Sequence, residues 1–255
     1  MYLMNKMTDT LADGKFQKLN RAPAYQAVSQ KIRSAIINGE LKAGELLPTE
    51  MDLAEQFGVT RTTIREAIRL LEYGGLIGRA DRKRLVVCLP SKESASNSLS
   101  TAMLMHEVTF KELWQIAMGL EPLAAGLACE SISTELKEKL ATNLEQTAAA
   151  KSDTKELLEA EIEFHNLIAQ ATCNNALLMA REPLNQLFYP AFKAVIDRMH
   201  PGGRILDCHT RMYEAICQGD KKTAEEWMRK HMVDFERGIK MAGLDFDGPI
   251  DHQSL

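Results

Sequence analysis

Apolar side chains between residues 24 and 75 recur at intervals of three and four positions, the period of one helical face. Residues 24–37 predict one amphipathic helix, and residues 48–75 predict two shorter helices joined by a tight turn at Gly58. Thr49 and Thr60 stand where N-cap hydroxyls would accept hydrogen bonds from free amide groups. The apolar faces consist of Val28, Ile32, Ala35 and Ile36, then Leu53, Ala54 and Phe57, and finally Ile64, Ala67, Ile68 and Leu71.

The stretch that follows, LIGRADRKRLVVCLP, has the pattern of a strand, a basic turn and a second strand. Three helices and such a wing make residues 23–90 a predicted winged helix-turn-helix domain. In this motif the start of the second helix of the turn faces base edges in the DNA major groove. The candidate DNA-binding residues are Thr60, Arg61, Thr62, Thr63 and Arg65 on that helix, with Arg82, Lys83 and Arg84 on the wing.

The residue types at these positions suit DNA. Arginine can pair with guanine O6 and N7, and threonine can reach phosphates or thymine methyl groups. A bare helix-turn-helix pattern also occurs in all-α proteins that never bind DNA. The preceding helix and the basic wing favour the DNA-binding interpretation.

From residue 100 onward the pattern is helical, with no strand signal. The predicted helices lie near 108–130, 134–149, 154–172, 175–199, 203–218 and 221–242, with further divisions near Pro183 and Pro190 because proline disrupts helix interiors. The predicted fold class is mainly α: a winged helix-turn-helix with a small β wing, followed by an all-α antiparallel bundle over residues 100–242. We expect flexible tails at 1–22 and 243–255 and a linker at 91–99.

Charge separates the two predicted domains. The 255-residue chain has a net charge of −4, with 45% hydrophobic and 26% charged residues, as in ordinary soluble proteins. Residues 23–90 carry 10 basic and 8 acidic groups, whereas residues 91–255 carry 17 and 25. The basic excess therefore lies with the predicted DNA-binding domain. Five scattered cysteines and the lack of a signal peptide or a long apolar run predict a cytoplasmic protein without a membrane segment.

Four residues of the predicted bundle form a candidate metal site. Glu161 and His165, at i and i+4, share one helical face. His209 and His231 lie ten residues before and twelve residues after Gly219, so an antiparallel helix pair brings them to nearly the same level. One carboxylate and three imidazoles suit a divalent transition metal with open coordination positions. The alternative is that these histidines are ordinary core or surface groups, because such spacings also arise by chance.

Residues 24–88 resemble the DNA-binding domain of the GntR family of bacterial transcription regulators. The resemblance implies DNA contacts at positions 60, 61, 62, 63 and 65. Met51 stands where many relatives have arginine, and Arg82-Lys83-Arg84 replaces the usual Gly-Arg-Gly wing tip. The matching residues are Ile36, Gly39, Leu41, Gly44, Leu47, Pro48, Glu50, Leu53, Ala54, Phe57, Gly58, Val59, Arg61, Thr63, Arg65, Ala67, Leu71, Gly75, Leu76 and Ile77.

Residues 100–242 resemble the FCD ligand-binding domain of the FadR subfamily. The resemblance implies zinc, nickel or manganese held by Glu161, His165, His209 and His231, with glutamate in place of the usual aspartate. It also implies a small carboxylate effector on the open metal positions. Ala117 stands where relatives carry arginine, so a ligand anchor or a structural pair is expected to be missing. The resemblance rests on Leu120-Glu121-Pro122, Phe164-His165, Ile168, Asn174, His209, Ala215-Ile216, Gly219-Asp220, Met228 and His231.

The sequence therefore predicts a dimeric transcription regulator rather than an enzyme. A small organic acid, bound at or near the metal, would release a repressor homodimer from a palindromic double-stranded DNA operator. Asn174 and Arg198 are assigned to the effector pocket. Two alternatives remain: a regulator whose effector pocket holds no metal, and a metalloenzyme with an accessory DNA-binding domain. The chain has no HExxH, GxSxG or glycine-rich phosphate loop to support the enzyme.

Overall fold

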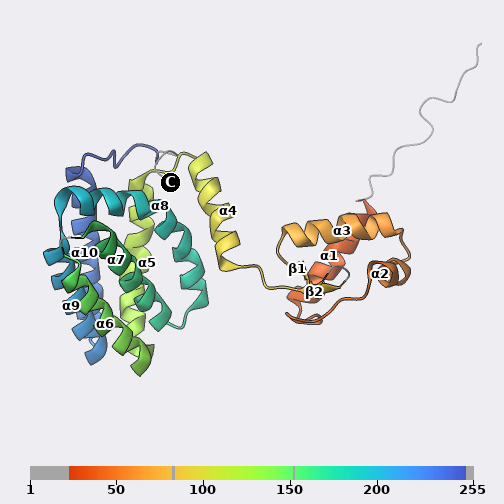
Figure 1. Cartoon of the computed structure of the whole chain (residues 1–255), viewed down its shortest axis with the longest axis horizontal. Coiled ribbons are helices and arrows are strands. Elements are labelled where there is room, and N and C mark those ends of the chain that lie inside the picture. The colour runs from red at the N-terminus through yellow and green to blue at the C-terminus, as the bar shows by residue number, and fades with distance from the viewer. Residues whose placement is uncertain (1–22, 82–83, 152, 251–255) are drawn as a thin grey trace, which may run out of the picture. The chain divides into compact units, whose positions relative to one another are not determined.

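A computed structural model describes residues 23–81, 84–151 and 153–250. The chain divides into two compact units, Met1–Pro90 and Ser91–Leu255 (Figure 1). The first unit holds three helices and a two-stranded sheet, and the second is all helical across its described residues. The mainly α fold class is confirmed. The predicted tail at 1–22 and residues 251–255 lie outside the described part of the chain.

The first unit is a winged helix-turn-helix. Its helices are α1 (Ala24–Ile37), α2 (Glu50–Phe57) and α3 (Arg61–Tyr73), and its strands β1 (Ile77–Arg79) and β2 (Leu85–Val87) pair antiparallel. The Thr49 and Thr60 hydroxyls cap α2 and α3 as predicted. Gly58 ends α2 with a φ of 63°, a left-handed conformation that favours glycine.

The apolar face predicted for α3 forms the core of this unit. Ile64, Ala67, Ile68 and Leu71 are buried there. They pack with Val28 and Ile32 of α1 and with the inner side chains of the two strands. The segment before α2 is also tied to the wing, because the Leu47 N–H donates to the Leu85 carbonyl. This packing fixes α3 while leaving its other face open to solvent.

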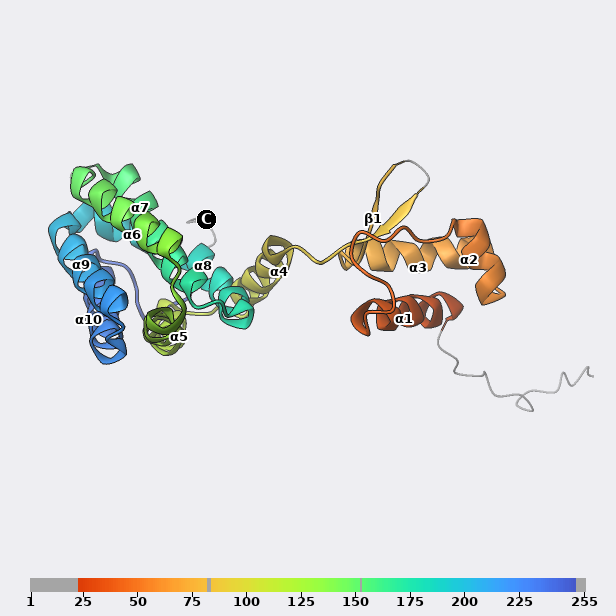
Figure 2. The ribbon, with the colours of Figure 1, turned by 90° about the horizontal axis from the view of Figure 1, so that it is seen from below.

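The second unit is a helical bundle in which some pairs of consecutive helices lie side by side. In Figure 2, α6 lies beside α7, and α9 lies beside α10. A turn at Gly219, with a φ of 73°, joins α9 to α10. The helices are α4 (Lys92–Met105), α5 (Phe110–Ser131), α6 (Thr134–Ala149), α7 (Thr154–Ala171), α8 (Asn175–Met199), α9 (Gly202–Gln218) and α10 (Lys221–Met241).

Residues 92–105 are helical, so most of the predicted linker at 91–99 is instead the start of α4. The Ser91 hydroxyl caps this helix by accepting from the Ser94 N–H. Polar contacts then hold α4 on α8, where Ser100 donates to Gln186 and Gln186 donates to Asn97. The serine-rich composition suggested a loop. The Ser91 cap and the contacts with α8 nevertheless stabilise a helix, although few apolar residues of α4 face α8.

The predicted divisions near Pro183 and Pro190 are also wrong, because both prolines lie inside the continuous α8. Proline removes one backbone hydrogen bond, but burial of neighbouring side chains such as Leu184 and Leu187 keeps the helix together. The described part of the predicted C-terminal tail, residues 243–250, packs against the bundle. Phe246 and Ile250 are buried, and the Ile250 N–H donates to the Val108 carbonyl.

Candidate metal centre and DNA-binding surface

Three helices of the second unit carry the predicted metal ligands. Glu161 and His165 lie one turn apart on α7, His209 lies on α9 and His231 lies on α10. The turn at Gly219 folds α10 back along α9, which brings the two histidine rings to a centroid distance of 5.0 Å. All four residues are at least 95% buried. The structure thus brings together the complete set that the sequence predicted.

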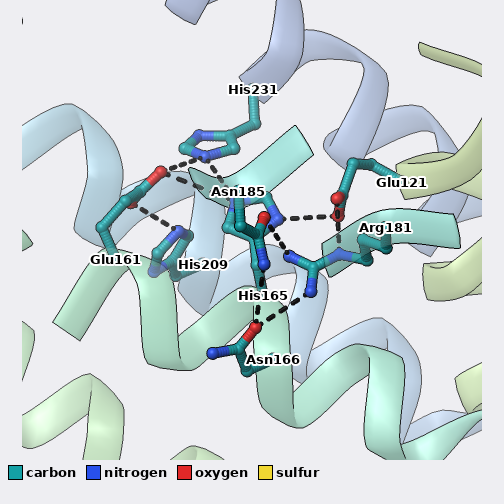
Figure 3. Close-up of polar contacts among 8 residues, drawn as sticks. All are labelled: Glu121, Glu161, His165, Asn166, Arg181, Asn185, His209 and His231. Carbon is teal, nitrogen blue, oxygen red and sulfur yellow. Dashed lines mark hydrogen bonds and ion pairs between the residues drawn. The ribbon is translucent and has the colours of Figure 1, made fainter. Parts of the chain in front are cut away.

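The potential ligand atoms converge on one point. One atom from each of the four residues lies within 4.8 Å of the others. Glu161 is at the centre, with Oε1 2.8 Å from His231 Nε2 and Oε2 3.1 Å from His209 Nε2 (Figure 3). His165 Nε2 lies 3.5 Å from Glu161 Oε1 and 3.1 Å from His231 Nε2. Glutamate therefore reaches all three rings, although the family pattern has aspartate.

Charge around the cluster keeps Glu161 ionised. Burial raises the pKa of this carboxyl, but His231 and His209 outweigh it and hold the pKa well below the ordinary value. Burial likewise lowers the pKa of His165 and His231, whereas Glu121 beside His165 and Glu161 beside His231 raise each to about 9. Only one proton fits between two Nε2 atoms 3.1 Å apart. His231 Nε2 also lies 2.8 Å from Glu161 Oε1, so a proton on this atom can face either Glu161 or His165.

His209 is held in a different state. Burial lowers its pKa to about 4, so the ring is neutral at pH 7. It stacks on Phe164 with a centroid distance of 3.7 Å. Neither ring nitrogen has a hydrogen-bond partner among the described residues, because the approach of Nε2 to Glu161 has poor hydrogen-bond geometry.

Buried polar atoms without partners are rare and costly, which makes them informative here. Glu161 Oε2 and both His209 nitrogens are in this state. A divalent cation would satisfy Glu161 Oε2 and one of these nitrogens at once. The residues therefore fit a transition metal bound through nitrogen and oxygen, with fewer protein ligands than an octahedral ion accepts.

A second group of polar side chains supports the cluster from behind, as Figure 3 shows. His165 Nδ1 is 2.8 Å from Glu121 Oε2, and Arg181 Nε donates to Glu121 Oε1 at 2.6 Å. Arg181 also donates to Asn166 and Asn185. Burial raises the pKa of Glu121, but Arg181 and His165 overcome it and lower the pKa to about 2. Carboxylates in this position fix the ring orientation of a metal-binding histidine.

No sequence pattern singled out Arg181. Ala117 stands in place of a family arginine, which predicted the loss of an anchor or a structural pair. Arg181, from α8, supplies the pair with Glu121 and shares a small cavity with Ala117. The available signal was Glu121 itself, because a carboxylate inside the apolar run GLEPLAAGLA requires a buried cation. The spacing of residues in the sequence did not show which basic side chain pairs with Glu121.

Next to the metal cluster lies a small cavity of about 50 Å³. Glu161 and His231 form part of its wall. The predicted pocket residues Asn174 and Arg198 lie elsewhere. Asn174 is an exposed N-cap of α8, and Arg198 donates to the Ala242 carbonyl. Asn174 thus caps the start of α8, and Arg198 contacts the end of α10. Neither lines this cavity, and their assignment to an effector pocket stays a prediction.

On the first unit, the N-terminus of α3 presents the predicted DNA-contacting side chains. Arg61 and Thr62 are exposed. Thr60 and Thr63 have a local role as well, because the Thr60 hydroxyl accepts from the Thr63 N–H and lies 2.9 Å from the Thr63 hydroxyl. These contacts fix the first turn of α3, the part that enters the major groove in such motifs.

Ion pairs orient two of the other predicted residues. Arg65 Nε lies 2.8 Å from Glu50 Oε2, which links α3 to α2. Arg84 on the wing donates to Asp81 through both its backbone N–H and its Nε. Arg82 and Lys83 lie outside the described residues. Among the described helices, none is long and apolar enough to cross a membrane.

Comparison with protein families matches both units. The model described as "Bacterial regulatory proteins, gntR family" matches residues 24–87, and the FCD domain model matches residues 112–234. Together they cover most of the chain. The stretch that the FCD model matches includes all four residues of the buried cluster and the Glu121–Arg181 pair.

The relatives that this chain matches over nearly their whole length are transcription regulators. The chain is 27% identical to the regulator LutR of Bacillus subtilis over 206 residues, which are 79% of this chain and 94% of LutR. It is 26% identical to the Glc operon transcriptional activator of Escherichia coli K12 over 232 residues, 87% and 91% of the two chains. The solved structure of Streptococcus agalactiae GntR has the same fold, with a TM-score of 0.62 at 23% identity over 84% of this chain and 99% of that one.

Proposed function

Because this chain belongs to the GntR family of transcription regulators and carries an FCD domain, we propose that a small organic acid, bound at a metal, controls its binding to DNA. The relatives are all regulators, so the metalloenzyme alternative is set aside. The observation that carries the proposal is the buried cluster of Glu161, His165, His209 and His231. Such a cluster inside an effector domain offers both a metal site and an anchor for an anion.

Zinc, nickel or manganese would be held by these four side chains. The metal would supply a positive charge and open coordination positions for a carboxylate. Glu121 and Arg181 would keep the His165 ring in place through its other nitrogen. The adjoining cavity gives the acid a place beside Glu161 and His231.

In the first unit, the start of α3 and the wing would contact DNA. The chain has one helix-turn-helix, and such proteins bind two half-sites as dimers, so a homodimer on a palindromic operator is expected. We assign a repressor role, although one relative is an activator. The acid weakens DNA binding only if it binds less tightly to the arrangement of the protein that binds DNA than to the arrangement that does not.

The helix α8 offers a physical connection for this coupling. Arg181 of α8 contacts Glu121 behind the metal cluster, and Gln186 of the same helix contacts Ser100 and Asn97 of α4. Helix α4 follows directly on the DNA-binding unit in the chain. A change at the cluster that shifts α8 would therefore alter how α4 is held.

Metal content tests the proposal most directly. Untagged wild-type protein, His209→Ala and the control His106→Ala would be analysed by elemental mass spectrometry. His106 is exposed at the end of α4, which makes it a matched control. About one metal ion per chain is expected in the wild type and the control, with none in His209→Ala. No metal in the wild type, even after divalent ions are added back, would favour the metal-free pocket instead.

Operator binding tests the regulatory half. The metal-loaded chain would be titrated with operator DNA, with and without a saturating acid found by screening. Weaker DNA binding in the presence of the acid supports a repressor released by its effector. Unchanged affinity would reject ligand control, and tighter binding would reject release from the operator by the acid.

A further inference from the structure

Three arginines follow one another at intervals of four residues along α3, so they share one side of the helix. They differ in what holds them. Among the described residues, Arg61 has no side-chain partner, and Arg69 donates to Glu66 of its own helix at 2.7 Å. Of the three, Arg65 alone is held from another helix, because its Nε donates to Glu50 Oε2 of α2 at 2.8 Å. Glu50 therefore ties this arginine to the other helix of the helix-turn-helix.

The Glu50 side chain is available for this role because other residues cap α2. The Thr49 hydroxyl accepts from the Asp52 N–H, and the Asp52 carboxylate accepts from the Thr49 N–H and hydroxyl. This capping box serves the first turn of α2 without the Glu50 carboxylate. An ion pair as exposed as Glu50 and Arg65 contributes little to folding. Its effect is therefore expected in DNA binding rather than in stability.

The geometry of the pair leaves donors for DNA. Glu50 accepts from Nε, and the two terminal nitrogens of Arg65 have no hydrogen-bond acceptor among the described residues. The guanidinium group is thus held in place while its terminal N–H groups stay free for phosphates or base edges. The carboxylate also offsets the positive charge of Arg65, which lowers the attraction to phosphates of any sequence.

We propose that Glu50 is a positioning residue that acts through Arg65 and makes DNA binding by this chain more selective. Holding the guanidinium in place favours a duplex whose contacts match that position. The negative charge of Glu50 weakens binding to duplexes in which Arg65 finds no such contact. The inference rests on the proposed function, because it assigns a role within the DNA-binding surface at the start of α3.

The test compares the affinities of the full chain for two DNA probes at one salt concentration. One probe is a duplex that the wild-type chain selects from a random-sequence library, and the other is a shuffled duplex of the same base composition. Glu50→Gln should lower the ratio of the two affinities about fivefold, which is within the usual coupling of residues in contact. Binding to the selected duplex should weaken, and binding to the shuffled duplex should strengthen.

Glu55→Gln is the matched control. It removes the same charge from an exposed position of α2, and Glu55 has no ion pair among the described residues. The ratio of affinities should stay at the wild-type value in this variant. A fall as large as that in Glu50→Gln would show that any lost charge on α2 has the same effect, which would overturn the inference.

A double-mutant cycle separates positioning from a local effect on α2. In the Arg65→Met background, Glu50→Gln should no longer change the ratio of affinities, because the arginine that it positions is gone. An equal fall in both backgrounds, or no fall in Glu50→Gln alone, would overturn the inference. Circular dichroism would show that each variant is folded before its binding is compared.

The proposed function and the inference fail in different ways. A wild-type chain that selects no sequence from the library fails the proposed DNA binding before any variant is made. A wild-type chain that prefers its selected duplex, with a preference that Glu50→Gln leaves unchanged, overturns only the role of Glu50.

Discussion

Each unit contains an arginine–glutamate pair that joins two helices, and the two pairs differ in nearly every physical respect. Arg181 and Glu121 have side chains only 3% and 6% exposed, whereas Arg65 and Glu50 are 55% and 21% exposed. The buried pair belongs to a network that ends at His165. The exposed pair stands at the surface proposed to meet DNA. The same two residue types therefore organise a protein interior in one unit and a solvent-facing surface in the other.

Burial decides what each pair can contribute. A buried charge must be paired, because removing its partner leaves an ion in a medium that solvates it poorly. An exposed pair contributes little to stability, because water and salt screen both charges. Its arginine is instead available to a ligand such as DNA. Four experiments test this comparison.

The largest expected effect is on stability. Replacing Arg181 with Met should lower the free energy of unfolding of the metal-free protein by about 3–5 kcal/mol, because Glu121 is left buried with only His165 as a charged partner. Arg65→Met should cost no more than about 1 kcal/mol. Urea unfolding followed by circular dichroism measures both. Equal losses would show that burial does not separate the two pairs.

Metal affinity should depend on pH at the buried site. The His231 pKa of about 9 means that a proton occupies the site below that pH and competes with the metal. Apparent affinity should therefore rise with pH, by at least about 50-fold between pH 7 and pH 9, the change for one displaced proton, since the pKa of His165 is raised to about 9 as well, and level off above that range. Competition with a chelator of known affinity measures it. A flat profile over this range would mean that no proton is displaced.

Removing the charge of Glu121 should weaken metal binding without removing a ligand. Glu121→Gln keeps a polar group beside His165, but it lowers the basicity of the His165 ring and holds the ring less firmly in its orientation. We therefore expect about a ten- to 100-fold loss of metal affinity. Cobalt substitution gives an independent reading, because the visible absorption of the bound ion reports its coordination. Glu50→Gln on the first unit is the control and should leave both the affinity and the spectrum unchanged.

The smallest expected effect concerns DNA. Arg65→Met should reduce operator affinity by about tenfold and lessen its dependence on salt, because one positive contact is lost. Metal content and metal affinity should not change. Titrations of labelled operator at several salt concentrations would measure this. Full retention of operator affinity would remove Arg65 from the proposed DNA-binding surface.

Local patterns were sufficient for the first unit and for most helices of the second. The N-caps Thr49 and Thr60, the turn at Gly58 and the buried face of α3 all follow from spacings of a few residues. Of the predicted wing tip, Arg84 is described and is ion-paired with Asp81. Such features depend on neighbours in the chain, which is why a single sequence predicts them.

The metal cluster was predictable for a related reason. Glu161 and His165 are one helical turn apart, and His209 and His231 lie at nearly equal distances on either side of Gly219. Helix geometry and one hairpin turn thus account for each pair, whereas the resemblance to the FCD domain joined the two pairs into one site. The metal itself and its effector stay proposals. By contrast, the serine-rich start of α4, the continuous α8 and the packing of Phe246 depended on contacts with distant elements.

The sequence by itself determined most of the helices, though not α4 or the continuity of α8, and it singled out the four residues of the metal cluster. A carboxylate such as Glu121 inside an apolar run also requires a cation. Only the tertiary structure decided that the cation is Arg181, 60 residues away on α8, and that Asn174 and Arg198 serve helix ends rather than the cavity. The physical reason is that local geometry follows from the covalent spacing of neighbouring residues. The pairing of buried charges depends on how whole helices pack, and many distant side chains share in that outcome.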